Sequence, residues 1–177
     1  QLARSFKVGV IRLTERFVTS DPLSRRDERR LVEYVRGEVG AYVAQVRRRG
    51  FDRVIGTSGT ILSLGVLAAQ QAGLPAADVR NLRVPAAALH RLRKQLVDLD
   101  LQQRVALPGL DPRRADLAVA GAVLFDTILQ ALGATEVWLC DLALREGLVL
   151  DYIRRNAAHI AQVDRYPDVR RRSAVEL

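Results

Sequence analysis

The spacing of apolar residues along this chain changes repeatedly between a period typical of strands and one typical of helices. Phe6, Val8 and Val10 alternate with Lys7 and Gly9, which predicts a short strand over residues 6–10. Residues 51–55 and 136–140 predict two further strands, and residues 82–84 predict a short strand or an extended link. Strands that alternate with helical segments favour an α/β fold.

The helical period occupies the segments between these strands. Ser24 is a suitable N-cap for a long helix over about 25–49, and Gly50 is a natural residue for its end. The apolar stripe of this helix consists of Leu31, Val35, Val39, Tyr42 and Val46. Further helices are predicted over 11–17, over 61–71, from residue 85 onward, over 112–132 with Gly133 as its cap, and over 146–156.

The turn after the strand at 51–55 carries the most suggestive chemistry of the chain. Its sequence is Gly56, Thr57, Ser58, Gly59 and Thr60, followed by an apolar helix. A strand that ends in such a turn offers backbone N–H groups and small hydroxyls at a helix N-terminus, which favours an anion such as phosphate. The alternative is a tight strand-to-helix turn that needs glycine and threonine only for its geometry.

Composition indicates a globular chain with a basic surface. The length of 177 residues allows one domain, or one domain with a tail, and 49% of the residues are hydrophobic and 27% charged. No stretch of 18 apolar residues occurs without a charged residue or a glycine, so no membrane-spanning helix is expected. The net charge is +8, and almost all of the positively charged residues are arginine. This charge predicts either a polyanionic partner or the biased composition of a GC-rich genome. Aromatic residues make up only 5%, which argues against a specific nucleic-acid interface. Because no long apolar run is unbroken, no membrane partner is expected.

Cysteine and histidine offer little chemistry. Cys140 is the only cysteine, so an intrachain disulfide is impossible, and a buried inert thiol in a reducing cytoplasm is expected. His90 and His159 have no cysteine or carboxylate at ligand spacing, so neither is predicted to bind metal. Ser58 lacks the local pattern of a hydrolase triad.

Four blocks in order resemble one family. They are Val8–Glu15 (sequence VGVIRLTE), Ile55–Thr60, Arg113–Asp116 with Ala120–Ala122, and Leu144–Leu148. Together they resemble the second domain of the exopolyphosphatase and guanosine pentaphosphate phosphohydrolase (Ppx/GppA) family. The resemblance implies a ribonuclease H-like domain of the actin-like ATPase and sugar kinase superfamily, incomplete at its N-terminal side. Residues 1–156 would be this partial domain. Residues 157–177, with Asp168–Ser173, resemble a tail or the start of a helical HD-type domain.

The resemblance also implies an activity. The parent protein would release terminal phosphate from inorganic polyphosphate or pppGpp in an Mg²⁺-dependent cleft between two domains. The family's first phosphate loops, its water-activating glutamate and the acidic groups near its metal have no counterpart in this sequence. No catalytic or metal-binding residue is therefore predicted here, and the chain alone is expected to be inactive.

The resemblance implies substrate contacts for a few residues. Gly56, Thr57, Ser58, Gly59 and Thr60 would contact phosphate or nucleotide, and Arg114 would grip phosphate oxygens or stack on guanine. Arg114 could instead pair with Asp111 or Asp116 at a helix start. Arg113 is turned away by one helical step, and Gly121 is expected to permit close helix packing.

Two residues near the last predicted helix are assigned local roles. Glu146 in the first turn should complement the helix dipole rather than act in catalysis. Asp141 is expected to cap that helix, the alternative being a position facing the cleft.

The resemblance predicts how the sheet is arranged. In a ribonuclease H-like order 3-2-1-4-5, this chain would hold strand 3 near residues 6–10 together with strands 4 and 5. An exposed edge on strand 3 would invite pairing with another copy, so a rearranged sheet or a homodimer is expected. The rival interpretations are a superfamily kinase or ATPase and a non-catalytic module for dimerisation or polyanion binding.

Overall fold

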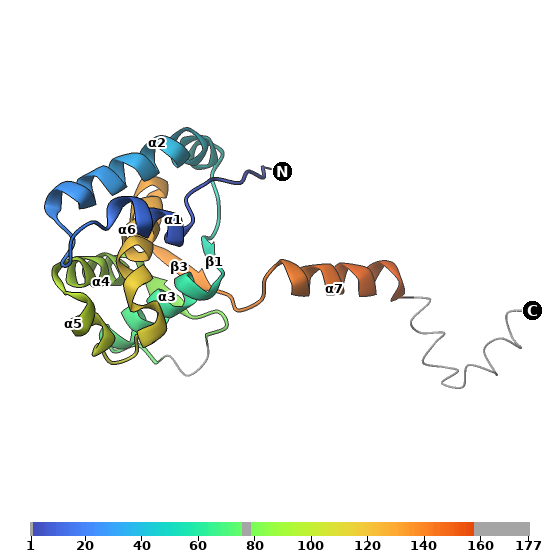
Figure 1. Ribbon diagram of the computed structural model, residues 1–177. Coiled ribbons are helices and arrows are strands. Elements are labelled where there is room, and N and C mark those ends of the chain that lie inside the picture. The colour runs from blue at the N-terminus through green and yellow to red at the C-terminus, as the bar shows by residue number, and fades with distance from the viewer. Residues whose placement is uncertain (1, 76–78, 158–177) are drawn as a thin grey trace, which may run out of the picture. The chain divides into compact units, whose positions relative to one another are not determined.

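The computed structural model describes residues 2–75 and 79–157 (Figure 1). These residues form two compact units, one up to Asp141 and one from Leu142 onward, and each is described by itself. The predicted tail after residue 157, with His159 and the block Asp168–Ser173, lies outside the described residues.

The order of elements confirms the α/β fold class. The first unit contains α1 (Val10–Phe17), α2 (Arg25–Arg49), β1 (Ile55–Gly56), α3 (Gly59–Gln71), β2 (Arg83–Pro85), α4 (Ala86–Asp98), α5 (Leu101–Val105), a 3₁₀ turn (Pro112–Arg114), α6 (Ala115–Leu132) and β3 (Glu136–Leu139). The second contains α7 (Leu144–Arg155).

Helix α6 is the centre of the first unit, with α1, α2, α3 and α4 packed around it (Figure 1). Its small and branched residues suit this position, and Val119, Ala120 and Val123 are buried. Gly133 ends the helix in the left-handed conformation, with φ 69°. Within the described residues, Pro112–Leu132 is also the one helix long and apolar enough to cross a membrane, but its apolar window is 61% buried inside the protein. The same apolar character is thus accounted for by a core helix.

Helix α2 begins and ends where the sequence predicts. The Ser24 side chain accepts a hydrogen bond from the backbone N–H of Asp27 at 3.1 Å, and Gly50 follows with φ 77°. Leu31, Val35 and Val39 are buried as expected. The stripe then continues through Val43 rather than Tyr42, whose ring packs edge-on against Phe6 at a centroid distance of 5.4 Å.

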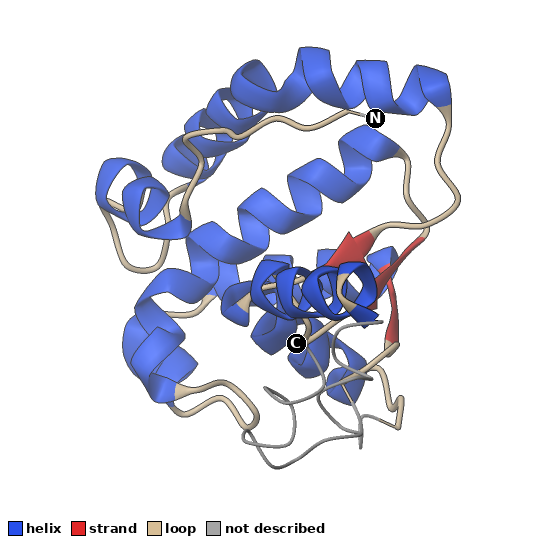
Figure 2. Ribbon diagram, turned by 90° about the vertical axis from the view of Figure 1, so that its right-hand side faces the viewer, coloured by secondary structure: helices blue, strands red, loops and turns tan. Residues whose placement is uncertain are grey.

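The described strands, drawn red in Figure 2, form a three-stranded sheet in the order β1-β3-β2. β1 and β3 are parallel neighbours, as predicted for strands 4 and 5, whereas β2 joins the other side of β3 antiparallel. Val84, Val137 and Leu139 face the helices and are buried. The opposite face carries exposed side chains, including Ile55 and Arg83.

The predicted strand over residues 6–10 is wrong. The chain there is extended without strand pairing among the described residues, and Val10 already begins α1. A strand requires a neighbour to satisfy its N–H and C=O groups, and none of the described segments lies beside it in a ladder. Among the described residues the sheet therefore has its two open edges at β1 and β2, each of which pairs only with β3.

Two of the local roles assigned near α7 are resolved. Glu146 accepts a hydrogen bond from the backbone N–H of Ala143 at 2.8 Å, which places its charge at the start of the helix as predicted. The assignment of Asp141 as the cap is wrong, because Ala143 occupies that position. The Asp141 carboxylate instead accepts a hydrogen bond from Arg80 Nε at 3.0 Å.

Candidate phosphate-binding site

The turn from β1 into α3 begins with a glycine required by packing. Gly56 is buried, and a Cβ there would lie 2.6 Å from Cγ2 of Ile61 and 3.3 Å from Cγ2 of Val137. Its carbonyl accepts a hydrogen bond from the backbone N–H of Cys140 at 2.9 Å, just beyond β3. Gly56 thus sets the position of the turn, and the exposed residues after it are the ones that could reach a ligand.

Ser58 holds an unusual backbone conformation at the start of α3. Its φ of 85° and ψ of 150° lie in a region that residues with a Cβ rarely adopt. Within the described structure, the Ser58 side chain makes no capping hydrogen bond to the first turn of α3. The first amides of this 13-residue helix therefore lack the usual side-chain acceptor, and they point toward the exposed Ser58–Gly59 peptide.

Arg114 lies directly against this helix start. If Gly59 carried a Cβ, that atom would be 2.9 Å from Nη2 and 3.0 Å from Cζ of Arg114. The Arg114 side chain is 46% exposed, and its Nε is 3.9 Å from Oδ2 of Asp111. The guanidinium is therefore only loosely paired, and it adds a full positive charge beside the positive end of the α3 dipole.

The neighbouring Arg113 is differently placed. Its side chain is 89% exposed, and its Nε and Nη2 donate to Asp111 at 3.3 Å each. These hydrogen bonds, with that from the Arg113 backbone N–H, hold the pKa of Asp111 below its usual value. Arg113 therefore pairs with Asp111, whereas Arg114 supplies the three atoms nearest to the Cβ position of Gly59.

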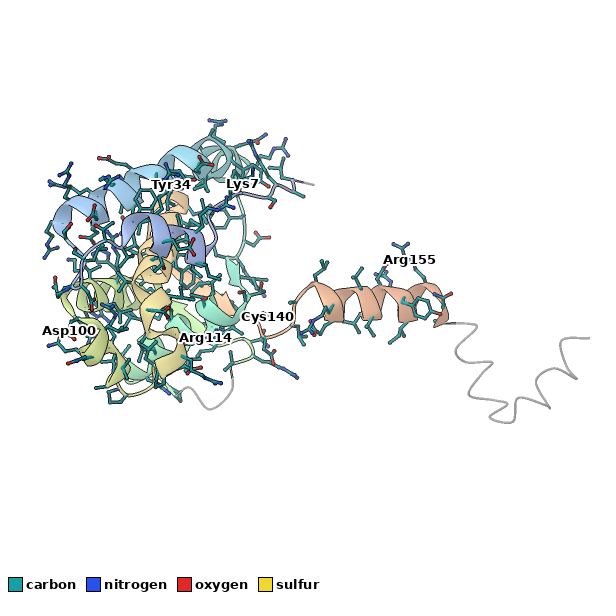
Figure 3. The ribbon with its side chains drawn as sticks, in the orientation of Figure 1. Lys7, Tyr34, Asp100, Arg114, Cys140 and Arg155 are labelled. Carbon is teal, nitrogen blue, oxygen red and sulfur yellow. The ribbon has the colours of Figure 1, made fainter. Side chains whose placement is uncertain are left out.

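The segment before Arg114 is fixed to the body of the protein. Leu110 is buried, and Gly109, with φ 91°, lies close to the side chains of Leu67 and Gln70 in α3. Arg104, only 3% exposed, donates from Nε to the carbonyl of Ala115 at 3.1 Å. Its Nη2 also pairs with Asp21 at 2.8 Å. These contacts explain why Arg114 has a defined position at the surface (Figure 3).

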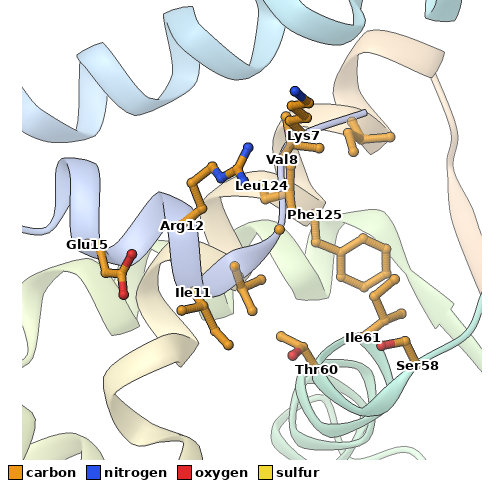
Figure 4. Close-up of a pocket in the computed structure, with 14 residues that line it drawn as sticks. Lys7, Val8, Ile11, Arg12, Glu15, Ser58, Thr60, Ile61, Leu124 and Phe125 are labelled. Atoms are coloured by element: carbon orange, nitrogen blue, oxygen red, sulfur yellow. The ribbon is translucent and has the colours of Figure 1, made fainter. Parts of the chain in front are cut away.

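A groove of about 750 Å³ adjoins the other side of the turn (Figure 4). Ser58, Thr60 and Ile61 line one wall, and α1 with the segment before it lines the opposite wall. Most of the lining is apolar, and the charged side chains come from Lys7, Arg12 and Glu15. The groove gives a ligand at Ser58 room to extend.

Thr60 connects this groove with the core. Residue 121 in α6 is a glycine, and a Cβ there would lie only 2.7 Å from Cγ2 of Thr60. Gly121 therefore permits the close helix packing that the sequence predicts, here between α3 and α6. The structure therefore brings Ser58, Gly59, Thr60 and Arg114 together, while Gly56 serves the strand and Thr57 lies between the two groups.

Metal-binding chemistry is not evident beside the turn. Across residues 2–75 and 79–157, the structure contains no group of three histidine, cysteine or acidic residues that could hold a metal ion. Hydroxyls, amides and a guanidinium surround the α3 start, whereas Mg²⁺ prefers carboxylate oxygens. The residues present do not fit a magnesium site.

His90 belongs to a structural cluster rather than to the turn. Its Nδ1 lies 3.0 Å from Oδ2 of the buried Asp126, which also accepts from Arg93 at 2.7 Å and from Gln130 at 2.8 Å. Arg93 reaches Glu28 as well, at 2.9 Å. The cluster therefore links α2, α4 and α6 through ion pairs around the buried Asp126. Cys140 is partly buried just after β3.

Comparison with known proteins identifies relatives over most of the chain. Residues 1–156 match the model of the Ppx/GppA phosphatase family. The chain is 33% identical over 153 residues to exopolyphosphatase 1 of Mycobacterium leprae, covering 85% of this chain and 44% of that protein. It is 27% identical over 155 residues to the guanosine-5'-triphosphate,3'-diphosphate pyrophosphatase of Vibrio parahaemolyticus, covering 86% of this chain and 30% of that protein.

Solved structures of the same family are also similar to this chain in fold. The crystal structure of an exopolyphosphatase from Cytophaga hutchinsonii superposes with a TM-score of 0.74 at 24% identity, covering 85% of this chain and 49% of that one. The chain thus spans less than half the length of these relatives. The chain shares the fold of the Cytophaga hutchinsonii relative, and the family match over residues 1–156 shows that it belongs to the Ppx/GppA phosphatase family.

Proposed function

We propose that this chain is part of a phosphoanhydride hydrolase that releases terminal phosphate from inorganic polyphosphate or pppGpp. Within that enzyme, this chain would bind phosphate through Ser58, Gly59, Thr60 and Arg114. The names of the relatives support both substrates, since one is an exopolyphosphatase and another is a guanosine-5'-triphosphate,3'-diphosphate pyrophosphatase.

The contact between Arg114 and Gly59 is the observation that carries the proposal. It places a loosely paired guanidinium at the start of a helix whose first amides lack a side-chain cap. A phosphate oxygen at this point would accept hydrogen bonds from the amides and from the guanidinium fork. Such donors stabilise the negative charge that a phosphoryl group carries during transfer.

The remaining chemistry would come from outside this chain. An attacking water needs a base, and we propose that the carboxylate base and the ligands of an Mg²⁺ ion belong to a preceding domain. Residues 1–156 would be the partial second domain that forms one wall of the cleft, followed by a tail or a further domain from residue 157. Alone, this chain would not turn over substrate, and the parent enzyme would work in the cytoplasm.

We also propose that the protein forms a homodimer. The free edge of β1 supports this, because Ile55 there is 61% exposed and unpaired backbone edges invite further strands. Large apolar side chains on α7 are also exposed, namely Leu144, Leu148, Val149, Leu150, Tyr152 and Ile153. Light scattering at high protein concentration should give a dimer mass, and a single monomeric species would refute the dimer.

Phosphate release tests the proposed activity. The full reading frame and this chain would be assayed side by side with Mg²⁺, using polyphosphate and pppGpp as substrates. We expect release by the full protein with at least one of the two and none by this chain. Turnover by the chain alone would show that the catalytic groups have been misplaced, and inactivity of both would refute the hydrolase assignment.

A further inference from the structure

The exposed face of the sheet carries an arginine cluster around the only tryptophan. Trp138 lies on β3, and the guanidinium carbons of Arg53 and Arg83 are each 4.5 Å from the centre of its ring. Arg83 is the register partner of Trp138 on β2, and Arg53 comes from the segment before β1, on the other side of β3. The two arginines therefore reach the ring from the two sides of β3, one from β2 and one from the segment before β1.

Both guanidiniums keep their hydrogen-bonding capacity. Across the described residues, neither Arg53 nor Arg83 takes part in an ion pair, unlike Arg113 beside Asp111. A cation–π contact uses the flat side of the guanidinium and leaves its N–H groups directed outward. The nearest strand carboxylate, Glu136, already accepts a hydrogen bond from Trp138 Nε1 at 2.8 Å. The stack thus holds two positive charges in place without neutralising them.

A hollow lies beside this stack. Its volume is about 350 Å³, and it is lined by residues 51–54, by residues 133–136 and by Trp138. Arg47, near the C-terminus of α2, adds a third guanidinium, whose Cζ is 3.6 Å from the position of a Cβ on Gly133. Asp52 is the opposing charge in the lining, together with the already bonded Glu136. Of the three guanidiniums only Arg53 lines this open, largely polar hollow, while Arg83 lies on the Trp138 ring and Arg47 lies beside Gly133.

The position of the cluster relates it to the candidate site. Arg53 precedes β1 and Ser58 follows it, so the two sites lie at opposite ends of one strand. Five residues of extended chain span at most about 17 Å, at roughly 3.4 Å a residue. A single extended anion could therefore contact both, whereas a ligand of two phosphates could not.

We infer that Arg53, Arg83 and the hollow beside Trp138 form a second anion site, which binds a linear polyphosphate away from the end that is cleaved. The identity of the ligand rests on the proposed function, and the site itself rests on the unpaired guanidiniums. Binding of a linear polyanion by several arginines predicts an affinity that falls steeply with salt.

The single tryptophan allows the site to be observed directly. Trp138 emission of this 177-residue chain would be followed during titration with long-chain polyphosphate and with pyrophosphate. We expect a saturable change in emission with long-chain polyphosphate. The double variant Arg53→Gln/Arg83→Gln should lower the affinity at least tenfold. The matched control, Arg26→Gln with Arg91→Gln, removes the same charge from exposed positions elsewhere and should change the affinity less than twofold. Anisotropy of end-labelled polyphosphate would give the same affinities independently of the ring's surroundings.

Several outcomes would overturn the inference. Unchanged affinity in the Arg53/Arg83 variant would show that these residues are not the site. Equally tight binding of pyrophosphate would exclude an extended ligand, and equal or tighter binding of single-stranded DNA would exclude a polyphosphate site in favour of a nucleic-acid one. Failure here is separable from failure of the proposed function, because hydrolysis is measured on the full protein and this binding on the chain alone.

Discussion

The guanidinium of Arg114 occupies the space that a side chain on Gly59 would need. Its Nη2 and Cζ come within 2.9 Å and 3.0 Å of that position. The two residues are 55 positions apart in sequence, yet the contact joins the start of α3 to the turn before α6. Glycine at position 59 is thus what lets a cation lie against the first amides of a helix.

Replacing this glycine tests the contact. Gly59→Ala should push the flexible Arg114 side chain aside and lower phosphate release by the full protein at least fivefold. Its cost in the free energy of unfolding should stay below about 1 kcal/mol, since exposed surface substitutions are usually mild. Chemical denaturation and initial rates would be measured together.

Gly37→Ala is the control for that variant. Gly37 is exposed in α2, and the described structure leaves open space around its Cβ position. Alanine there should stabilise the fold by about 1 kcal/mol and leave the rate unchanged. Equal rates for the two variants would mean that the position of Arg114 does not matter.

The backbone of Ser58 gives a second prediction. Its φ of 85° is strained for serine and free of strain for glycine. Ser58→Gly should therefore raise the free energy of unfolding by about 1 kcal/mol, measured by thermal or urea denaturation. Ser58→Val, which introduces a β-branched side chain at the same φ, should lower it. A destabilised glycine variant would argue that the serine side chain supports the turn.

The start of α2 predicts a pH effect. Hydrogen bonds from Thr19 and Ser24, followed by the contact with Arg30, lower the pKa of Asp27. Because the folded-state pKa lies below the unfolded one, the ionised Asp27 stabilises the protein above a pH of about 4, and this contribution is lost as the pH falls through the folded-state pKa.

Asp27→Asn removes that contribution. The variant should be less stable than the wild type at pH 7, and the gap should narrow steadily below pH 4. Urea denaturation from pH 7 to pH 3 would measure it. A gap that stays constant with pH would show that the ionisation of Asp27 has no part in capping α2.

Local sequence signals account for much of the fold. Ser24 and Gly50 predict both ends of α2, because capping depends on the residues at the helix end. The strand expected at residues 6–10 fails for the opposite reason, since a strand depends on a neighbour that the local pattern cannot reveal. The pattern over residues 82–84 fits a strand or an extended link equally well for the same reason, since the pairing of β2 with β3 is a long-range property.

The candidate site shows the same division. The Gly56–Thr60 turn is visible in the sequence, but Arg114 was singled out only through the family resemblance. Arg104 was missed, because nothing in its neighbours shows that a charged residue would be buried against Ala115 and Asp21. The stack on Trp138 likewise requires strand register that periodicity does not supply.

The most direct test of the account compares two adjacent arginines in the full protein. Arg114→Gln and Arg113→Gln each remove one positive charge from the same turn, but only Arg114 lies against Gly59. The measurement is kcat/KM for phosphate release from polyphosphate and from pppGpp. We expect Arg114→Gln to lower it on the order of 100-fold, as loss of one preorganised donor does, and Arg113→Gln to stay within about twofold of the wild type. Equal effects of the two variants, or full activity of Arg114→Gln, would contradict a phosphate-binding role for the start of α3.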